Sequence, residues 1–204
     1  MKLLGVTGGI GMGKTTVARI MARHGAAVAD TDEISHRLTR VGQPALGRIR
    51  EVFGGSFFKG DGSLDRGALA GIVFNDGAAR EKLESILHPT IRETWMTEAQ
   101  KWREEGRRVG VVVIPLLFET EAQKHFDAVI CAACSGATME RRLSARGWTR
   151  EQMASRAAAQ WPVEKKIAAS DYVIWTDTTL EATEAQVRVI IDSTGKGQRT
   201  PACG

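Results

Sequence analysis

A glycine-rich segment near the N-terminus, residues 8–15, limits the fold of this chain more than any other feature. It reads Gly-Gly-Ile-Gly-Met-Gly-Lys-Thr and satisfies the pattern Gly-x4-Gly-Lys-[Ser/Thr] in full. An apolar stretch before it, residues 3–6, predicts a buried strand, and apolar spacing over residues 14–24 predicts an amphipathic helix after it. A chance glycine-rich turn is the alternative. The complete motif between a strand and a helix favours a loop that binds the phosphates of a nucleotide.

The residue types of this loop suit phosphate groups and a metal ion. Glycines let backbone N–H groups wrap closely round phosphate oxygens, because glycine can adopt a positive φ. We expect Lys14 to reach the β- and γ-phosphates of ATP and the Thr15 hydroxyl to coordinate Mg²⁺. The predicted nucleotide-binding residues of the loop are Gly9, Gly11, Met12, Gly13, Lys14, Thr15 and Thr16.

Strands and helices alternate along most of the remaining chain. Further strands are predicted at residues 26–29, 109–114, 128–132 and 172–175. Their alternation with helices predicts an α/β fold with a mainly parallel sheet. Residues 45–105 read as helices only, with a break between two of them at His88-Pro89, so we expect an inserted helical lobe there. Arginine-rich helices are predicted within residues 138–160, a last helix at 180–191, and a flexible tail at 196–204.

Composition and charge narrow the class of protein. The 204 residues suit one domain, and the net charge of +4 suits nucleotides and phosphorylated small molecules. The basic residues are spread along helices, which disfavours nucleic acid as a partner. No signal peptide and no apolar run of membrane-spanning length is present, so we expect a cytoplasmic protein without a membrane partner. Cys131 and Cys134 read as a buried structural pair in preference to a zinc or redox site.

An acidic pair follows the second predicted strand. Asp30 and Asp32 would lie beyond the carboxyl end of that strand, which is where ligands bind in doubly wound sheets. A carboxylate there can accept the proton of an attacking hydroxyl, as a kinase requires. The alternative is that one of the two only caps the helix beginning near Glu33. The chain lacks the Asn-Lys-x-Asp segment with which GTPases commonly read guanine, so a small-molecule kinase is favoured over a switch GTPase.

Along nearly its whole length the sequence resembles the dephospho-coenzyme A kinase family. The matching segments, in order, are Gly5 to Gly11 with Gly13-Lys14-Thr15, Asp30-Thr31-Asp32, Gly42-Gln43-Pro44-Ala45-Leu46, Leu64-Asp65-Arg66, Ile86-Leu87-His88-Pro89, Pro115-Leu116-Leu117-Phe118-Glu119, Phe126-Asp127, Arg142, Arg146 and Gln160 with Lys165. The phosphate loop alone is generic, whereas this combination in this order is specific to the family.

The resemblance implies transfer of the ATP γ-phosphoryl group to the ribose 3′-hydroxyl of dephospho-coenzyme A, with Mg²⁺ as cofactor. It implies a P-loop kinase core with an inserted lobe that holds the acceptor and a helical lid at about residues 137–165. Asp32 would be the base, with Asp30 as a metal contact through water, and Arg142 the lid arginine, supported by Arg146 at the nucleotide. The implied acceptor-binding residues are Thr7, Asp32, Arg37, His88, Arg92, Leu116 and Glu119.

Several positions depart from the family pattern, and other functions stay open. Met12 stands where a small residue is usual, Val113 where many members carry Asp, and Trp175-Thr176 where relatives tend to have Asp-Asn. His88 either contacts the acceptor or only ends a helix. Arg142 and Arg146, four residues apart, share a helix face that favours a catalytic role over a solvated one. Another small-molecule kinase and a non-catalytic ATP-binding protein remain as alternative functions.

Overall fold

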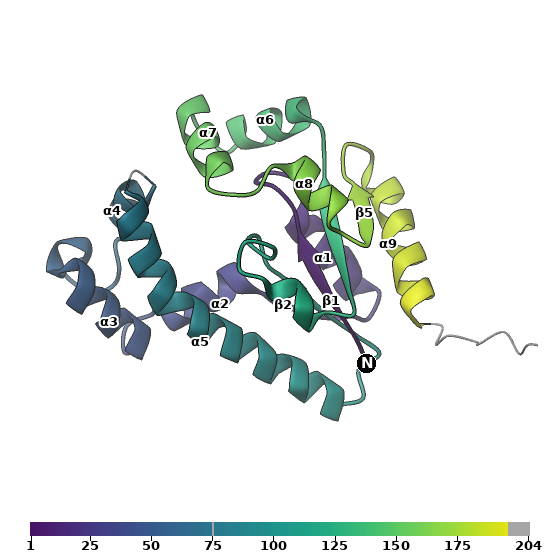
Figure 1. The fold of residues 1–204 in the computed structure, drawn as a ribbon, viewed down its shortest axis with the longest axis horizontal. Helices are drawn as coiled ribbons and strands as arrows, with labels where there is room; N and C mark the ends of the chain where they lie inside the picture. The colour runs from purple at the N-terminus through teal and green to yellow at the C-terminus, as the bar shows by residue number, and fades with distance from the viewer. Residues whose placement is uncertain (75, 196–204) are drawn as a thin grey trace, which may run out of the picture. The chain divides into compact units, whose positions relative to one another are not determined.

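The computed structural model of the chain describes residues 1–74 and 76–195, so the tail predicted at 196–204 lies outside the described residues. The strands are β1 (Lys2–Thr7), β2 (Ala27–Asp30), β3 (Val109–Val113), β4 (Ala128–Ala133) and β5 (Tyr172–Trp175). The α-helices are α1 (Lys14–Arg23), α2 (Thr31–Leu38), α3 (Pro44–Phe53), α4 (Arg66–Val73), α5 (Gly77–Glu104), α6 (Gly136–Ser144), α7 (Arg150–Ala158), α8 (Val163–Ala168) and α9 (Leu180–Gly195) (Figure 1). Two short 3₁₀ helices are η1 (Gly55–Phe57) and η2 (Ala122–His125).

The chain forms two compact units. The first comprises Met1–Val28 and the chain from Ala99 onward, and the second comprises Ala29–Glu98. The second unit contains α2, α3, α4 and most of α5, together with η1.

The sheet has five strands in the order β2-β3-β1-β4-β5. β1 pairs in parallel with β3 on one side and β4 on the other, and β4 pairs in parallel with β5. Because parallel strands need a crossover connection, they alternate with helices along the chain. All five residues of β3 are buried, as its unbroken β-branched run predicts for a strand covered on both faces. The predicted α/β fold with a mainly parallel sheet is confirmed.

One face of this sheet is covered by α1 and α9, which also pack against each other (Figure 1). The side chains that meet there are fully apolar and include Val17 and Met21 of α1 and Val187 of α9, each at 0% exposure. The other face receives α8, which packs on β4. Burial on both faces holds β1 rigidly, so the loop that follows β1 begins from a fixed point.

The second unit has an apolar core of its own. Its buried side chains come from α3, α4 and the start of α5, together with the turn before α4; they are Leu46, Ile49, Leu64, Leu69, Val73 and Ala79. α4 begins at Asp65, whose carboxylate accepts a hydrogen bond from the N–H of Ala68 at 3.0 Å. The predicted helices around Leu46 and Leu69 are therefore present.

The predicted break at His88-Pro89 is wrong, because α5 runs without interruption from Gly77 to Glu104 with Pro89 inside it. Proline removes one backbone N–H donor and disfavours a helical residue before it. Apolar side chains on both sides of Pro89 offset this cost: Ile86 packs against the core of the second unit, and Trp95 and Ala99 are buried. Tertiary packing overrides the local preference here.

Candidate active site

The phosphate-loop segment lies between β1 and α1, as predicted, and its glycines are required by its shape. Gly8, Gly11 and Gly13 have φ values of 141°, 71° and 90°, a region that side-chain-bearing residues rarely adopt. A Cβ atom on Gly8 would lie 2.1 Å from the carbonyl oxygen of Ala132 in β4. The loop therefore passes so close to the neighbouring strand that only glycine fits at that position.

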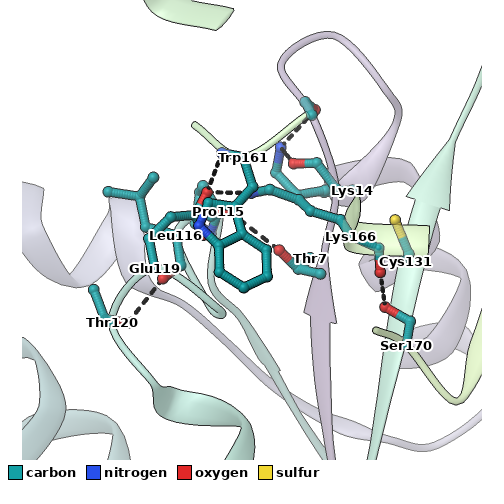
Figure 2. Close-up of polar contacts among 12 residues, drawn as sticks. Thr7, Lys14, Pro115, Leu116, Glu119, Thr120, Cys131, Trp161, Lys166 and Ser170 are labelled. Carbon is teal, nitrogen blue, oxygen red and sulfur yellow. Dashed lines mark hydrogen bonds and ion pairs between the residues drawn. The ribbon is translucent and has the colours of Figure 1, made fainter. Parts of the chain in front are cut away.

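Lys14 is folded over the loop that precedes it. Its Nζ atom donates hydrogen bonds to the carbonyl oxygens of Gly8 and Gly9, each at 2.9 Å (Figure 2). The N-cap residue of α1 is Gly13, which has no side chain, so no capping group competes with a phosphate for the first N–H groups of the helix. Thr15 is exposed and Thr16 half-buried in the first turn of α1. The loop thus combines an ammonium group, a helix N-terminus and an exposed hydroxyl.

The buried side chain of Met12 packs against the phosphate loop. Its side chain is buried and packs against Gly9, where a Cβ atom would lie 2.8 Å from the methionine sulfur. Its carbonyl oxygen accepts a hydrogen bond from the hydroxyl of Thr176 at 3.1 Å. Met12, which departs from the small residue usual in the family, therefore fills space beneath the loop.

Arg142 joins α6 to the phosphate loop and to the end of β5. Its Nη1 atom donates to the Thr176 hydroxyl at 2.9 Å and to the carbonyl oxygen of Gly11 at 3.4 Å, and its Nη2 atom donates to the Thr176 carbonyl oxygen at 2.6 Å. Arg146 is exposed and lies beyond Ser144, the last residue of α6, so the predicted helix face shared by Arg142 and Arg146 is wrong. Thr176 was not predicted as a site residue, and the only sequence signal was its departure from the residue that relatives tend to have.

A second group of polar contacts lies beside the loop, and we name it the Lys166 network: Thr7, Pro115, Glu119, Trp161 and Lys166 (Figure 2). The Lys166 ammonium, at 0% exposure, lies 2.9 Å from Glu119 Oε1 and donates to the Pro115 carbonyl oxygen at 2.6 Å. The backbone N–H of Trp161 donates to the same Glu119 oxygen at 2.7 Å, and the Thr7 hydroxyl donates to the Pro115 carbonyl oxygen at 3.2 Å.

The Lys166 network contains two predicted site residues, Thr7 and Glu119, and two that the sequence did not reveal, Trp161 and Lys166. The predicted residue Leu116 lies beside it, and its carbonyl oxygen accepts a hydrogen bond from the Thr120 hydroxyl at 2.8 Å.

Both cysteines of the predicted pair are buried and form no disulfide. Burial raises the pKa of the Cys131 thiol to about 11, although the ammonium groups of Lys166 and Lys14 act in the opposite direction. Burial also raises the pKa of Cys134. Both thiols are therefore protonated at neutral pH, which agrees with the predicted structural role.

The other predicted site residues belong to the second unit. Asp30 caps α2, since its Oδ1 atom accepts a hydrogen bond from the N–H of Asp32 at 2.9 Å, whereas the Asp32 side chain is exposed in the first turn. Arg37 forms an ion pair with Glu98 at 2.6 Å. His88 lies within α5, one turn before Arg92. Desolvation lowers the pKa of His88, and so does the charge of Arg92, while Glu84 raises it.

Comparison with known proteins identifies the family. The family model for dephospho-CoA kinase, CoaE, matches residues 2–182. The chain belongs to the dephospho-CoA kinase family. The match covers β1, the phosphate loop, the helical unit, the Lys166 network and α6 to α8, so every predicted site residue of this family member lies within it.

Several dephospho-CoA kinases are similar to this chain over most of its length. A dephospho-CoA kinase from Burkholderia lata is 43% identical over 190 residues, which is 92% of this chain and 93% of that protein. One from Bdellovibrio bacteriovorus is 37% identical over 174 residues, covering 85% of this chain and 87% of that protein. The solved structure of a dephospho-CoA kinase from Campylobacter jejuni superposes with a TM-score of 0.69 at 26% identity, covering 96% of this chain and 98% of that one.

The donor set of this dephospho-CoA kinase family member fits a magnesium ion that arrives with a nucleotide. Within residues 1–74 and 76–195, no three His, Cys, Asp or Glu side chains gather where they could hold a metal ion. Magnesium is commonly held by few protein ligands together with substrate phosphates, and the exposed Thr15 hydroxyl at the loop suits that arrangement. Among the described residues, no helix is both long enough and apolar enough to span a membrane.

Proposed function

We propose that this protein transfers the γ-phosphoryl group of ATP to the ribose 3′-hydroxyl of dephospho-coenzyme A, producing coenzyme A and ADP. In this reaction the hydroxyl oxygen bonds to the γ-phosphorus, the bond from that phosphorus to the bridging oxygen breaks, and ADP leaves. The observation that carries the proposal is a complete phosphate loop, with its ammonium group over the loop carbonyls, in a chain that matches the family over residues 2–182. With ATP as donor, we place the activity in the cytoplasm.

We assign the nucleotide to the phosphate loop. The N–H groups of the loop and of the start of α1 would hold the phosphate oxygens, with Gly9, Gly11 and Gly13 giving them room. Lys14 would leave the carbonyl oxygens of Gly8 and Gly9 and bind the β- and γ-phosphates. Thr15 would hold Mg²⁺, which supplies positive charge to the phosphates, with Asp30 as a candidate contact through water.

We assign the base to Asp32, which would accept the proton of the attacking hydroxyl. This choice follows the family resemblance, in which the second acidic residue of the Asp-x-Asp pair acts as the base. Asp30 is occupied as the cap of α2, and Asp32 is exposed.

The remaining roles follow the family resemblance. Arg142, with Arg146, would neutralise the migrating phosphoryl group from a lid at about residues 137–165, which contains α6, α7 and part of α8. The helical stretch at about 45–105 would be the insertion that holds the acceptor. The acceptor-binding residues in this proposal are Thr7, Asp32, Arg37, His88, Arg92, Leu116 and Glu119.

The test is a coupled assay of ADP release with purified protein, Mg²⁺-ATP and dephospho-coenzyme A. We expect turnover that depends on the acceptor, that stops when EDTA removes divalent metal, and that returns with added Mg²⁺. Shikimate, AMP and gluconate serve as alternative acceptors. Turnover with one of these and none with dephospho-coenzyme A would contradict the proposed substrate, and absence of turnover with every acceptor would favour a non-catalytic ATP-binding protein.

A further inference from the structure

Lys166 is the feature of the first unit that the family resemblance left without a role. A lysine is almost never fully buried unless it is paired, because its charge must be taken out of water. Lys166 has 0% exposure, and its ammonium group contacts Glu119 Oε1 and the Pro115 carbonyl oxygen. Such a buried ion pair is weak evidence for stability, since an apolar replacement often performs as well. Its presence therefore points to a role other than stability.

The position of the Lys166 ammonium places it next to the phosphate loop. Pro115 follows β3, and its carbonyl oxygen also accepts the hydrogen bond of Thr7, the residue directly before Gly8. Both Lys166 and Lys14 influence the charge state of Cys131, whose Cα pairs with that of Thr7 across β1 and β4. One ammonium group thus connects α8 with the ends of two central strands (Figure 2).

Only one of the two carboxylate oxygens of Glu119 has hydrogen-bond donors among the described residues. Its Oε1 atom receives both the Lys166 ammonium and the Trp161 N–H, whereas its Oε2 atom is shielded from solvent and has no hydrogen-bond partner among the described residues. A buried carboxylate oxygen without a donor is costly, and in native proteins such an atom calls for an explanation, for example an ordered water, an ion or a role in function. The chemistry that satisfies it is a hydroxyl or N–H donor.

The surroundings keep this carboxylate in one orientation. The Trp161 ring stacks on Phe118, with centroids 5.6 Å apart and an angle of 9° between the planes. The Lys165 ammonium lies 3.4 Å from the centroid of the same ring. These two contacts stabilise the position of Trp161 in which its backbone N–H is directed at Glu119 Oε1. Rotation of the carboxylate would break this bond and the Lys166 contact together.

We propose that Lys166 is a positioning residue for phosphoryl transfer, which fixes Glu119 so that Oε2 accepts a hydrogen bond from a hydroxyl or N–H group of the acceptor substrate. This inference rests on the proposed function. It explains in one arrangement why a lysine is buried beside the phosphate loop and why one oxygen of Glu119 is left without a donor.

A double-mutant cycle tests the proposal, using Lys166→Met, Glu119→Gln and the double variant. Melting temperature, kcat and the KM values for ATP and dephospho-coenzyme A are measured at a temperature below all melting points. We expect Lys166→Met to lower the melting temperature, because it leaves the Glu119 charge buried without its partner. The double variant, which has no buried charge at this place, should regain most of that stability.

In contrast to stability, activity should not be regained in the double variant. Misplacement of a substrate-orienting group costs up to about 10²-fold in rate, so each single variant should lose about 10²-fold in kcat/KM for the acceptor, with the KM for ATP near that of the parent. The double variant should lose no more than either single variant, because Lys166 acts through Glu119. Lys124→Met is the matched control: its surface pair with Glu121, at 4.0 Å with the lysine 60% exposed, should be dispensable for both stability and activity.

Three results would overturn the inference while the parent enzyme still phosphorylates dephospho-coenzyme A. One is a folded Lys166→Met protein with the kcat/KM of the parent, which would make the ion pair purely structural. Another is a loss of kcat/KM in the double variant that equals the product of the losses in the two single variants, which would mean that the two residues act independently. The third is a loss that falls on the KM for ATP, which would place Lys166 on the phosphates directly. A parent enzyme without acceptor turnover would instead contradict the proposed function itself.

Discussion

At the residue scale, the Lys14 ammonium group is bonded to backbone carbonyl oxygens of the phosphate loop, and it would have to leave them to bind a nucleotide. Its ammonium bonds to two loop carbonyls that a phosphate would replace as partners, so the side chain is already within the loop when the nucleotide arrives. The ammonium group therefore lies at the loop before a nucleotide binds.

We expect Lys14→Ala to lower kcat by about 10²–10³-fold, the usual effect of removing one electrostatic contact from a transition state. The side chain contributes no buried apolar surface to the core, so circular dichroism and melting temperature should remain close to those of the parent. Steady-state kinetics with dephospho-coenzyme A provide the measurement. Near-normal turnover by a folded Lys14→Ala protein would contradict the assignment of the loop.

Asp30 and Asp32 can be separated by the same substitution at both positions. Asp32→Asn keeps the size of the side chain but removes its ability to take a proton, so we expect a loss of about 10²–10⁴-fold in kcat. Asn is as good a helix cap as Asp, so Asp30→Asn should preserve the cap of α2 and cost less activity.

The measurement for this pair is phosphoryl transfer at saturating Mg²⁺-ATP and acceptor, together with ATP affinity by calorimetry. Affinity should change little in Asp32→Asn because the phosphate loop is intact. If Asp30→Asn were the more damaged of the two, the base would have been assigned to the wrong carboxylate.

At the scale of elements, α6 is attached to the phosphate loop through Arg142 and Thr176. The guanidinium bonds to Gly11 and to both oxygens of Thr176, so it contributes to the ground-state structure as well as to any role on the migrating phosphoryl group. We expect Arg142→Ala to lower the melting temperature modestly and kcat strongly, with a smaller effect on ATP affinity.

Thr176→Val is the control that isolates the structural part of this contact. It keeps the shape of a side chain that is only 3% exposed, while removing the hydroxyl that bonds to Arg142 and Met12. If Arg142 acts on the phosphoryl group, Thr176→Val should lose stability and retain most of kcat. Equal losses of kcat in the two variants would mean that Arg142 serves only to hold the loop.

At the scale of the whole molecule, His88 makes folding stability depend on pH. Desolvation lowers the pKa of His88 in the folded chain below its ordinary value near 6.5, so the unfolded chain binds more protons in the interval between these values. Above about pH 6.5 His88 is neutral in both states and does not reduce the free energy of unfolding. As the pH falls from there through the folded-state pKa, the unfolded chain binds the extra proton and the free energy of unfolding decreases.

We expect His88→Gln to weaken this acid sensitivity, because glutamine does not titrate. The measurement is the melting temperature of both proteins at intervals from about pH 7.5 to about pH 5. The two curves should run parallel near neutrality and diverge below about pH 6.5, with the parent falling more steeply. Curves that stay parallel to the acid end would show that another group causes the acid loss.

Sequence reasoning succeeded where the relevant contacts are local. The phosphate loop was predictable because its partners are its own neighbours: Lys14 bonds to residues five and six positions away, and the glycines are required by the turn itself. The strands and the parallel sheet were predictable for a similar reason, since apolar periodicity is a local property. The capping role considered for one aspartate is confirmed at Asp30, and it was predictable because an N-cap bonds within its own first turn.

The sequence by itself therefore determined the fold class, the phosphate loop and the family of this protein. Only the tertiary structure decided that Pro89 continues a helix, that Arg142 reaches Gly11 from 131 residues away, and that Lys166 is buried against Pro115 from 51 residues away. The physical reason is that these contacts depend on packing between distant segments, whose energies exceed local preferences and leave no periodic trace in the sequence. Lys166 reads as one more charge on a short helix until the chain is folded around it.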